Sequence, residues 1–190
     1  MRQTLSVLVE NKPGVLARIA GLFSRRAFNI QSLSVAETER AGYSRMTIVA
    51  LGDRAAVEQI EKHLNKLINV IKVSNLMRSR AVERELGLVK VMADADSRPS
   101  ILQIVEMFRA RVVDVAPRSL VIEATGDQDK LDALLGILAP YGVSEVVRSG
   151  PLALARGQSR MGLGDGAIAP DLAESTTQRG GTPDVQRNQH

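Results

Sequence analysis

One order of hydrophobic patterns occurs twice along the chain, and it limits the possible folds more than any other feature. In each half, a run with strand-like alternation precedes a helical pattern, two more strand-like runs, a second helical pattern and a last strand. The expected strands of the first half are 2–9, 30–37, 44–51 and 70–76, with helices at 13–27 and 53–67. Those of the second half are 85–93, 112–116, 119–125 and 143–147, with helices at 99–109 and 127–138. The repeated order βαββαβ predicts antiparallel sheets that each carry two helices on one face.

We therefore predict an α+β protein made of two ferredoxin-like βαββαβ domains in tandem, at residues 1–77 and 78–157. Residues 158–190 lose all periodicity and are dominated by Gly, Ser, Thr, Asp, Pro and Gln. Such a composition buries too little apolar surface to offset the entropy of ordering the chain. We expect a disordered tail there.

Composition excludes several classes of chemistry. The chain has no cysteine, which excludes disulfides and thiolate sites, and only two histidines, so that a metal site rich in His is not expected. No apolar run is long enough to span a membrane and no signal pattern opens the chain, so we expect a cytoplasmic protein. The first 80 residues hold 13 Lys and Arg against 6 Asp and Glu. That excess fits a docking face for an acidic partner or nucleic acid, and equally a scattered solvated surface.

The junction between the first strand and the first helix has the residues of an anion site. Its sequence is Glu10-Asn-Lys-Pro-Gly-Val-Leu16. Pro13 suits the first helical position, and Gly14 leaves the helix mouth open to a ligand. The N–H groups of Gly14, Val15 and Leu16 are then expected to point out of the helix unpaired, where they attract a carboxylate or phosphate. Asn11 offers an amide that caps the helix or holds a polar ligand group. An ordinary strand-to-helix turn has the same residues, and these residues alone leave both readings open.

Two other functions find little support in the sequence. The carboxylates that pair by spacing resemble solvated loop residues, and no nucleotide-binding loop or nucleophile elbow is present; the pairs are Glu37 with Glu39 and Asp94 with Asp96. We therefore expect no catalytic residues and no metal site. The βαββαβ order is also that of RNA-recognition motifs, but the expected central strands carry none of the aromatic residues that stack bases. We expect no nucleic-acid partner.

Several stretches together resemble a known family. They are Ser6–Asn11, Glu10–Leu16, Gly21–Leu33, Ser44–Ile48, Gln59–Val70, Val82–Val91 and Arg148–Gly150. The first half resembles an ACT domain, a small amino-acid-sensing module. From the N-terminus to about Gly157, the chain resembles the regulatory (small) subunit of acetolactate synthase, also called acetohydroxyacid synthase.

The resemblance implies a non-catalytic regulatory subunit that acts in branched-chain amino acid biosynthesis. Such a subunit activates a thiamine-diphosphate-dependent catalytic subunit and confers feedback inhibition by valine, leucine or isoleucine. Thiamine diphosphate, magnesium and FAD are then expected in the catalytic subunit, and no cofactor in this chain. The alternative is a free-standing ACT-type amino-acid-binding module that regulates a different partner.

The resemblance also implies where the effector binds. ACT domains pair edge to edge as a homodimer, with the effector between them. Asn11, Gly14, Val15 and Leu16 would come from one protomer, and Asn29 and Ile30 from the other. The second half has Asp94-Ala-Asp-Ser-Arg-Pro-Ser100 at the corresponding junction. We therefore expect only the first domain to hold an effector.

Overall fold

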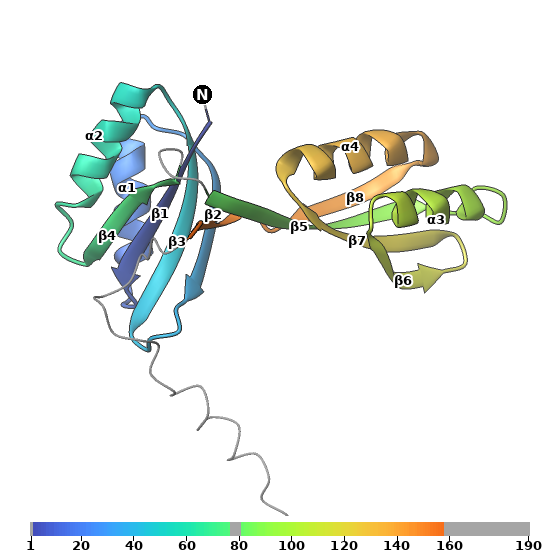
Figure 1. Ribbon diagram of the computed structural model, residues 1–190, viewed down its shortest axis with the longest axis horizontal. Coiled ribbons are helices and arrows are strands. Elements are labelled where there is room, and N and C mark those ends of the chain that lie inside the picture. Colours follow the sequence, from blue (N-terminus) through green and yellow to red (C-terminus); the bar gives the residue numbers. More distant parts are fainter. Residues whose placement is uncertain (1, 77–80, 158–190) are drawn as a thin grey trace, which may run out of the picture.

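The computed structural model describes residues 2–76 and 81–157, which form two units of βαββαβ order (Figure 1). The first unit has a sheet of order β2-β3-β1-β4. Its strands are β1 (Arg2–Glu10), β2 (Ile30–Glu37), β3 (Tyr43–Leu51) and β4 (Val70–Asn75). Helices α1 (Val15–Arg25) and α2 (Arg54–Leu64) pack on one face of this sheet, on alternate residues of β1 and β3. Asp53 caps α2, because its carboxylate accepts from Ala56 N at 2.7 Å.

The second unit repeats the arrangement with its own core. Strands β5 (Ala81–Met92), β6 (Arg111–Ala116), β7 (Ser119–Gly126) and β8 (Val143–Arg148) have the order β6-β7-β5-β8. Helices α3 (Arg98–Met107) and α4 (Gln128–Leu138) cover one face, and a short 3-10 helix, η2 (Ala139–Tyr141), follows α4. The prediction of two ferredoxin-like α+β units is confirmed.

One strand and part of another were missed. β5 begins at Ala81 instead of 85, and its first residues pair with an additional strand, β9 (Leu152–Ala155). β9 has only four residues, too few to show a period in the sequence. β9 pairs with residues 81–84 of β5, before the part of β5 that pairs with β7 and β8, and we call this two-stranded extension of the second sheet the ribbon.

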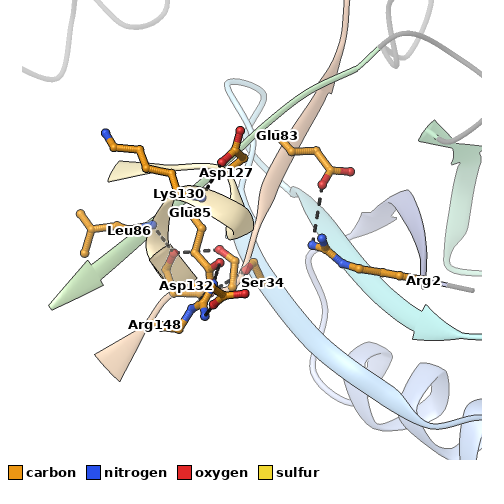
Figure 2. Close-up of polar contacts among 11 residues, drawn as sticks. Arg2, Ser34, Glu83, Glu85, Leu86, Asp127, Lys130, Asp132 and Arg148 are labelled. Carbon is orange, nitrogen blue, oxygen red and sulfur yellow. Dashed lines mark hydrogen bonds and ion pairs between the residues drawn. The ribbon is translucent and has the colours of Figure 1, made fainter. Parts of the chain in front are cut away.

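The ribbon lies on the helix-free face of the first sheet and joins the two units (Figure 1). β9 runs against β1, with Ala153 only 7% exposed. Two polar contacts also link the units (Figure 2): Ser34 Oγ donates to the carbonyl oxygen of Ser149 at 2.9 Å, and Arg2 Nη2 lies 3.7 Å from Glu83 Oε2. β5 then continues from the ribbon into the second sheet, so one strand belongs to both structures.

The segment Arg148–Gly150, one of the stretches that suggested the family, has a structural role at this joint. Arg148 donates to both carboxylate oxygens of Glu85, at 3.0 and 2.7 Å, and to Asp132 at 2.5 Å (Figure 2). The hydrogen bond from Arg148 to Glu85 raises the pKa of the guanidinium above its ordinary value. Ser149 Oγ accepts from Leu86 N at 3.1 Å. These contacts hold the end of β8 against β5.

Two predictions lie outside the described residues. The boundary between 77 and 78 falls inside the segment 77–80, and the tail 158–190 follows the last described residue. The domain limits therefore stay predictions. No helix in the described ranges is long and apolar enough to cross a membrane.

Candidate functional site

The turn between β1 and α1 leaves the start of α1 open, but its geometry differs from the prediction. α1 begins at Val15, so Pro13 lies in the turn before it and not at its first position. Gly14 occupies the N-cap with φ of 84°, a left-handed conformation that glycine adopts without the strain caused by a Cβ. No side chain caps this helix.

The N–H groups at this turn are only partly free. Val15 N donates to the carbonyl oxygen of Lys12 at 3.3 Å, which corrects the expectation that all three groups are unpaired. Within the described ranges, no hydrogen bond engages the N–H of Gly14 or Leu16. The side chain of Leu16 is 44% exposed, whereas that of Val15 is buried. Two N–H donors and an exposed aliphatic side chain therefore lie together at the positive end of the α1 dipole.

Asn11 lies at the rim of this turn and does not cap α1. Its Nδ2 donates to Glu37 Oε1 at 3.2 Å, and its backbone N donates to the carbonyl oxygen of Gly42 at 2.8 Å. Asn11 and Glu37 are both exposed. The contact places the carboxylate at the end of β2 beside the mouth of α1. Sequence reasoning grouped Glu37 with solvated loop carboxylates, because only the pairing of β2 with β3 carries it to this place.

Neighbouring charges at this end of the sheet are already paired. Glu10 accepts from Asn69 Nδ2 at 2.6 Å and lies 3.0 Å from Lys12 Nζ. These contacts lower the pKa of Glu10 below its ordinary value, and the hydrogen bond from Asn69 contributes most. Arg18 Nη1 donates to Asn69 Oδ1 at 3.1 Å. The side-chain amide of Asn11 therefore contacts the carboxylate of Glu37 and not that of Glu10.

Asn29 and Ile30 lie at the opposite end of the same sheet. Ile30 pairs with Ala50, and Ala50 pairs with Gln3 near the start of β1. Asn11 instead follows Glu10, the last residue of β1. The strand from Gln3 to Glu10 spans about 23 Å. Between α1 and β2 the left-handed backbone conformation belongs to Ala27, with φ of 55°. One copy of the chain therefore does not bring its own Asn11 and Asn29 together.

A second copy can bring them together, because β2 is an edge strand. Within residues 2–76 and 81–157, β2 pairs only with β3. Antiparallel pairing of two β2 strands sets the Ile30 end of one beside the Glu37 end of the other. In such a pair, Asn29 and Ile30 of one copy would approach the turn of the other copy that holds Asn11 and Gly14.

The corresponding junction of the second unit is closed. Ser97 N and Ser97 Oγ both donate to Asp94 Oδ1, at 2.8 and 2.6 Å, and Asp94 N donates back to Ser97 Oγ at 3.1 Å. These hydrogen bonds lower the pKa of Asp94 below its ordinary value, and the one from the Ser97 side chain contributes most. Arg98 Nη2 donates to the carbonyl oxygens of Ala93, Ala116 and Pro117, at 3.1, 2.8 and 3.0 Å. The carboxylate of Asp94 is thus already bound to Ser97, directly before α3, and Arg98 fixes the surrounding loops through their carbonyl oxygens.

Comparison with known proteins gives one consistent answer for both units. The family model of the AHAS small subunit-like ACT domain matches residues 5–72, and that of the small subunit of acetolactate synthase matches residues 84–157. The chain is 55% identical over 159 residues to the acetolactate synthase small subunit of Mycobacterium bovis. These residues are 84% of this chain and 95% of that protein. It belongs to the acetolactate synthase small-subunit family.

Other members of the family agree in sequence and in structure. The acetolactate synthase small subunit of Mycolicibacterium smegmatis is 56% identical over 159 residues, which are 84% of this chain and 94% of that protein. The crystal structure of the acetolactate synthase small subunit from Thermotoga maritima has a TM-score of 0.77 and 41% identity, and covers 84% of this chain and 99% of that one. The resemblance to the small-subunit family and its ACT domain is confirmed. The six effector-site residues stay a prediction.

Proposed function

We propose that this chain is the regulatory subunit of an acetolactate synthase and has no catalytic role of its own. It activates a thiamine-diphosphate-dependent catalytic subunit and confers feedback inhibition by a branched-chain amino acid. Valine is the first candidate effector, followed by leucine and isoleucine. The observation that carries the proposal is the match to named small subunits over nearly their whole length, through both units. Thiamine diphosphate, magnesium and FAD belong to the catalytic subunit in this proposal.

The effector binds between two copies that pair through β2. The position of β2 at the edge of its sheet and the separation of Asn11 from Asn29 within one copy support this arrangement. A site of this kind exists only in the dimer, so effector binding favours one pairing geometry over another. The catalytic subunit senses that difference, and by linkage it changes the affinity for the effector in return.

Each part of an α-amino acid has a complementary group in this proposed site. The carboxylate binds the N–H groups of Gly14 and Leu16 at the positive end of α1. The ammonium group binds Glu37, whose carboxylate already accepts from Asn11, and the partner's Asn29. The aliphatic side chain packs on the partner's Ile30. Discrimination between valine and alanine is modest, because one buried methylene contributes only about 0.8 kcal/mol.

The test is acetolactate formation from pyruvate by the cognate catalytic subunit, with and without this chain, over a valine titration. We expect the chain to stimulate the reaction and valine to reverse the stimulation. Asn11→Ala and Asn29→Ala should each raise the valine concentration for half-inhibition about tenfold or more, because each removes a hydrogen bond to a charged group. Stimulation without valine should stay close to that of the unaltered chain.

Asn65→Ala is the matched control, since it also removes an exposed amide from the first unit but at the end of α2. Full valine sensitivity of both site variants would show that the effector binds elsewhere. Valine binding without any stimulation of the catalytic subunit would favour the alternative, a free-standing ACT-type module that regulates a different partner.

A further inference from the structure

The turn between α2 and β4 exposes an apolar side chain that the proposed effector site does not use. Ile68 is 87% exposed, more than any other large apolar residue of the described ranges. Turns are usually built from Gly, Pro, Asn, Asp and Ser, and an isoleucine left in water adds no burial to its own fold. Single exposed apolar residues are common, so Ile68 indicates a contact only if its surroundings do so as well.

A second isoleucine lies beside the first. Ile71 is 40% exposed and stands at the bulge where the pairing of β4 with β1 shifts register, between Val70 and Lys72. Three residues of chain span at most about 10 Å, so the two isoleucines are neighbours. The turn and the start of β4 thus form a small apolar projection at the edge of the first sheet.

Cations without a counter-ion flank this projection. Lys62, in the last turn of α2, and Lys66, just after it, are both exposed, and none of the described residues forms an ion pair with either. The stretch 62–76 holds three Lys and no Asp or Glu. Burial lowers the pKa of His63 most, and the charges of Arg26 and Lys66 lower it further. The end of α2 therefore carries positive potential that the chain itself leaves uncompensated.

The cations of the second unit are mostly engaged by their own unit. Its ion pairs are Lys90 with Glu145, Arg111 with Glu123 and Arg148 with Glu85. Arg98 is held by three carbonyl oxygens. Uncompensated lysines are thus not a general property of this surface. Part of the basic excess of the first 80 residues gathers at one place, the end of α2.

The same turn is tied to the candidate effector turn. Asn69 Nδ2 donates to Glu10 Oε2 at 2.6 Å, and Glu10 N donates to the carbonyl oxygen of Asn69 at 2.9 Å. Arg18 of α1 donates to Asn69 Oδ1 at 3.1 Å. Asn69 is therefore bonded to both elements that flank the candidate effector turn. The turn after α2 also lies on the side of the first unit away from the second unit, where a partner can reach it (Figure 1).

An acidic protein surface fits these features better than a small ligand or a nucleic acid. A small ligand needs a pocket that encloses it, whereas Ile68 projects. Protein interfaces combine a few buried apolar anchors with a polar rim, and uncompensated lysines on one side select acidic groups on the other. Nucleic acid would bind the lysines through its phosphates but would leave both isoleucines without a function.

We propose that this projection docks on an acidic surface of the catalytic subunit, with Ile68 inserted in an apolar recess. The docking surface consists of Lys62, Lys66, Ile68 and Ile71. The proposal rests on the proposed function and adds to it the place of contact. Because β4 is the edge opposite β2, the docking surface stays accessible when two copies pair through β2. Asn69 joins this surface to the effector turn, so a shift of that turn on effector binding changes the docking geometry.

The anchor is tested by titrating the full chain into a fixed amount of catalytic subunit and measuring acetolactate formation. Ile68→Asp should raise the concentration for half-maximal stimulation about tenfold or more, because it places a carboxylate in an apolar recess beside acidic groups. Met107→Asp is the matched control, since Met107 is 70% exposed on α3 of the second unit. It should leave that concentration unchanged. Both substitutions are at exposed sites, and equal thermal unfolding midpoints would show that folding is unaffected.

The rim is tested by charge reversal. Lys62→Glu combined with Lys66→Glu should raise the concentration for half-maximal stimulation about tenfold or more at low salt. Added sodium chloride should weaken the unaltered chain and have less effect on this variant, because salt screens an attraction that the variant lacks. Arg109→Glu combined with Arg118→Glu makes the same change of charge at exposed positions of the second unit and should behave as the unaltered chain does.

The possible failures are distinguishable. Unchanged half-maximal stimulation in Ile68→Asp would overturn the docking surface while leaving the proposed function intact. The same salt dependence in the lysine variant as in the unaltered chain would overturn the acidic partner surface. An unaltered chain that does not stimulate the catalytic subunit at all would instead refute the proposed function.

Two other partners predict different results. If the lysines bind nucleic acid, a labelled oligonucleotide should bind the unaltered chain and not the lysine variant, at unchanged half-maximal stimulation. If Ile68 joins two copies of the chain, Ile68→Asp should weaken self-association in sedimentation equilibrium, again at unchanged half-maximal stimulation. Either result would overturn the proposal.

Discussion

At the residue scale, Gly150 is the position where a single added methyl group should matter most. Its φ is 72°, and a Cβ at this residue would overlap Ser32 Oγ on the first sheet. The same residue directly follows Ser149, whose carbonyl oxygen accepts from Ser34. Gly150 is therefore required both by its own backbone and by the close approach of the two units.

Gly150→Ala should lower the free energy of unfolding more than Gly157→Ala does. Gly157 has the same φ of 72° but nothing within 4 Å of an added Cβ, so it reports the backbone strain alone. We expect the difference between the two variants to be about 1–3 kcal/mol, the cost of overpacking a close contact. Chemical denaturation with both variants measures it, and Ser32→Gly should recover part of the loss. Equal effects of the two substitutions would show that the joint relaxes freely.

Asn11 and Glu37 show which residues of the candidate site can be predicted from residue type alone. Asn11 was predicted to belong to the effector site from its place before the helix, and that prediction still awaits its test. Glu37 was passed over, because a carboxylate at a strand end is usually solvated. Its hydrogen bond to Asn11 depends on the register between β2 and β3, which no local pattern in the sequence specifies.

At the scale of elements, the two edges of the first sheet are expected to differ. β2 and β4 are both edge strands and carry similarly exposed apolar residues, with Val35 at 44% and Ile71 at 40%. In the proposed dimer only β2 pairs with a second copy. A charge placed on an edge strand is a common obstacle to such pairing.

Val35→Lys should weaken the dimer about tenfold or more, because it adds like charges near the two-fold axis of the β2 pair. Ile71→Lys is the matched control on β4 and should leave the dimer unchanged. Light scattering after size exclusion, over a range of protein concentrations, separates the two. The reverse order of effects would place the interface at β4 and remove the structural basis of the shared effector site.

At the scale of the whole molecule, the segment 158–190 should be dispensable for the proposed regulation. The relatives from Mycobacterium bovis and Mycolicibacterium smegmatis match over 159 residues, which are already 95% and 94% of their length. We expect deletion of 158–190 to leave both the stimulation of the catalytic subunit and its reversal by valine unchanged. Steady-state assays of the deleted and full chains, with the same catalytic subunit, measure both. Reduced stimulation by the deleted chain would show that this segment contacts the catalytic subunit.

The order of helices and strands was largely predictable, because each element carries its own period of apolar residues. The starts of α2 and α4 are also fixed locally, because Asp53 and Asp127 each accept from the backbone N–H three residues further on. The predictions failed where an element is too short to show a period of apolar residues, or where that period does not mark the end of a helix or its buried face. β9 was too short to detect, α1 starts two residues later than expected, and Leu16 is exposed although it fits the helical stripe.

The sequence by itself determined the two βαββαβ units, the absence of cysteine chemistry and the family, because these depend on local periodicity and on residue identity along the chain. Only the tertiary structure decided what lies beside what. It placed Asn11 and Asn29 at opposite ends of one sheet, set β2 at the edge of that sheet, and laid the ribbon across the helix-free face of the first sheet. Such contacts join residues far apart in sequence, and strand register and the packing of one unit on another, not any local pattern, decide them.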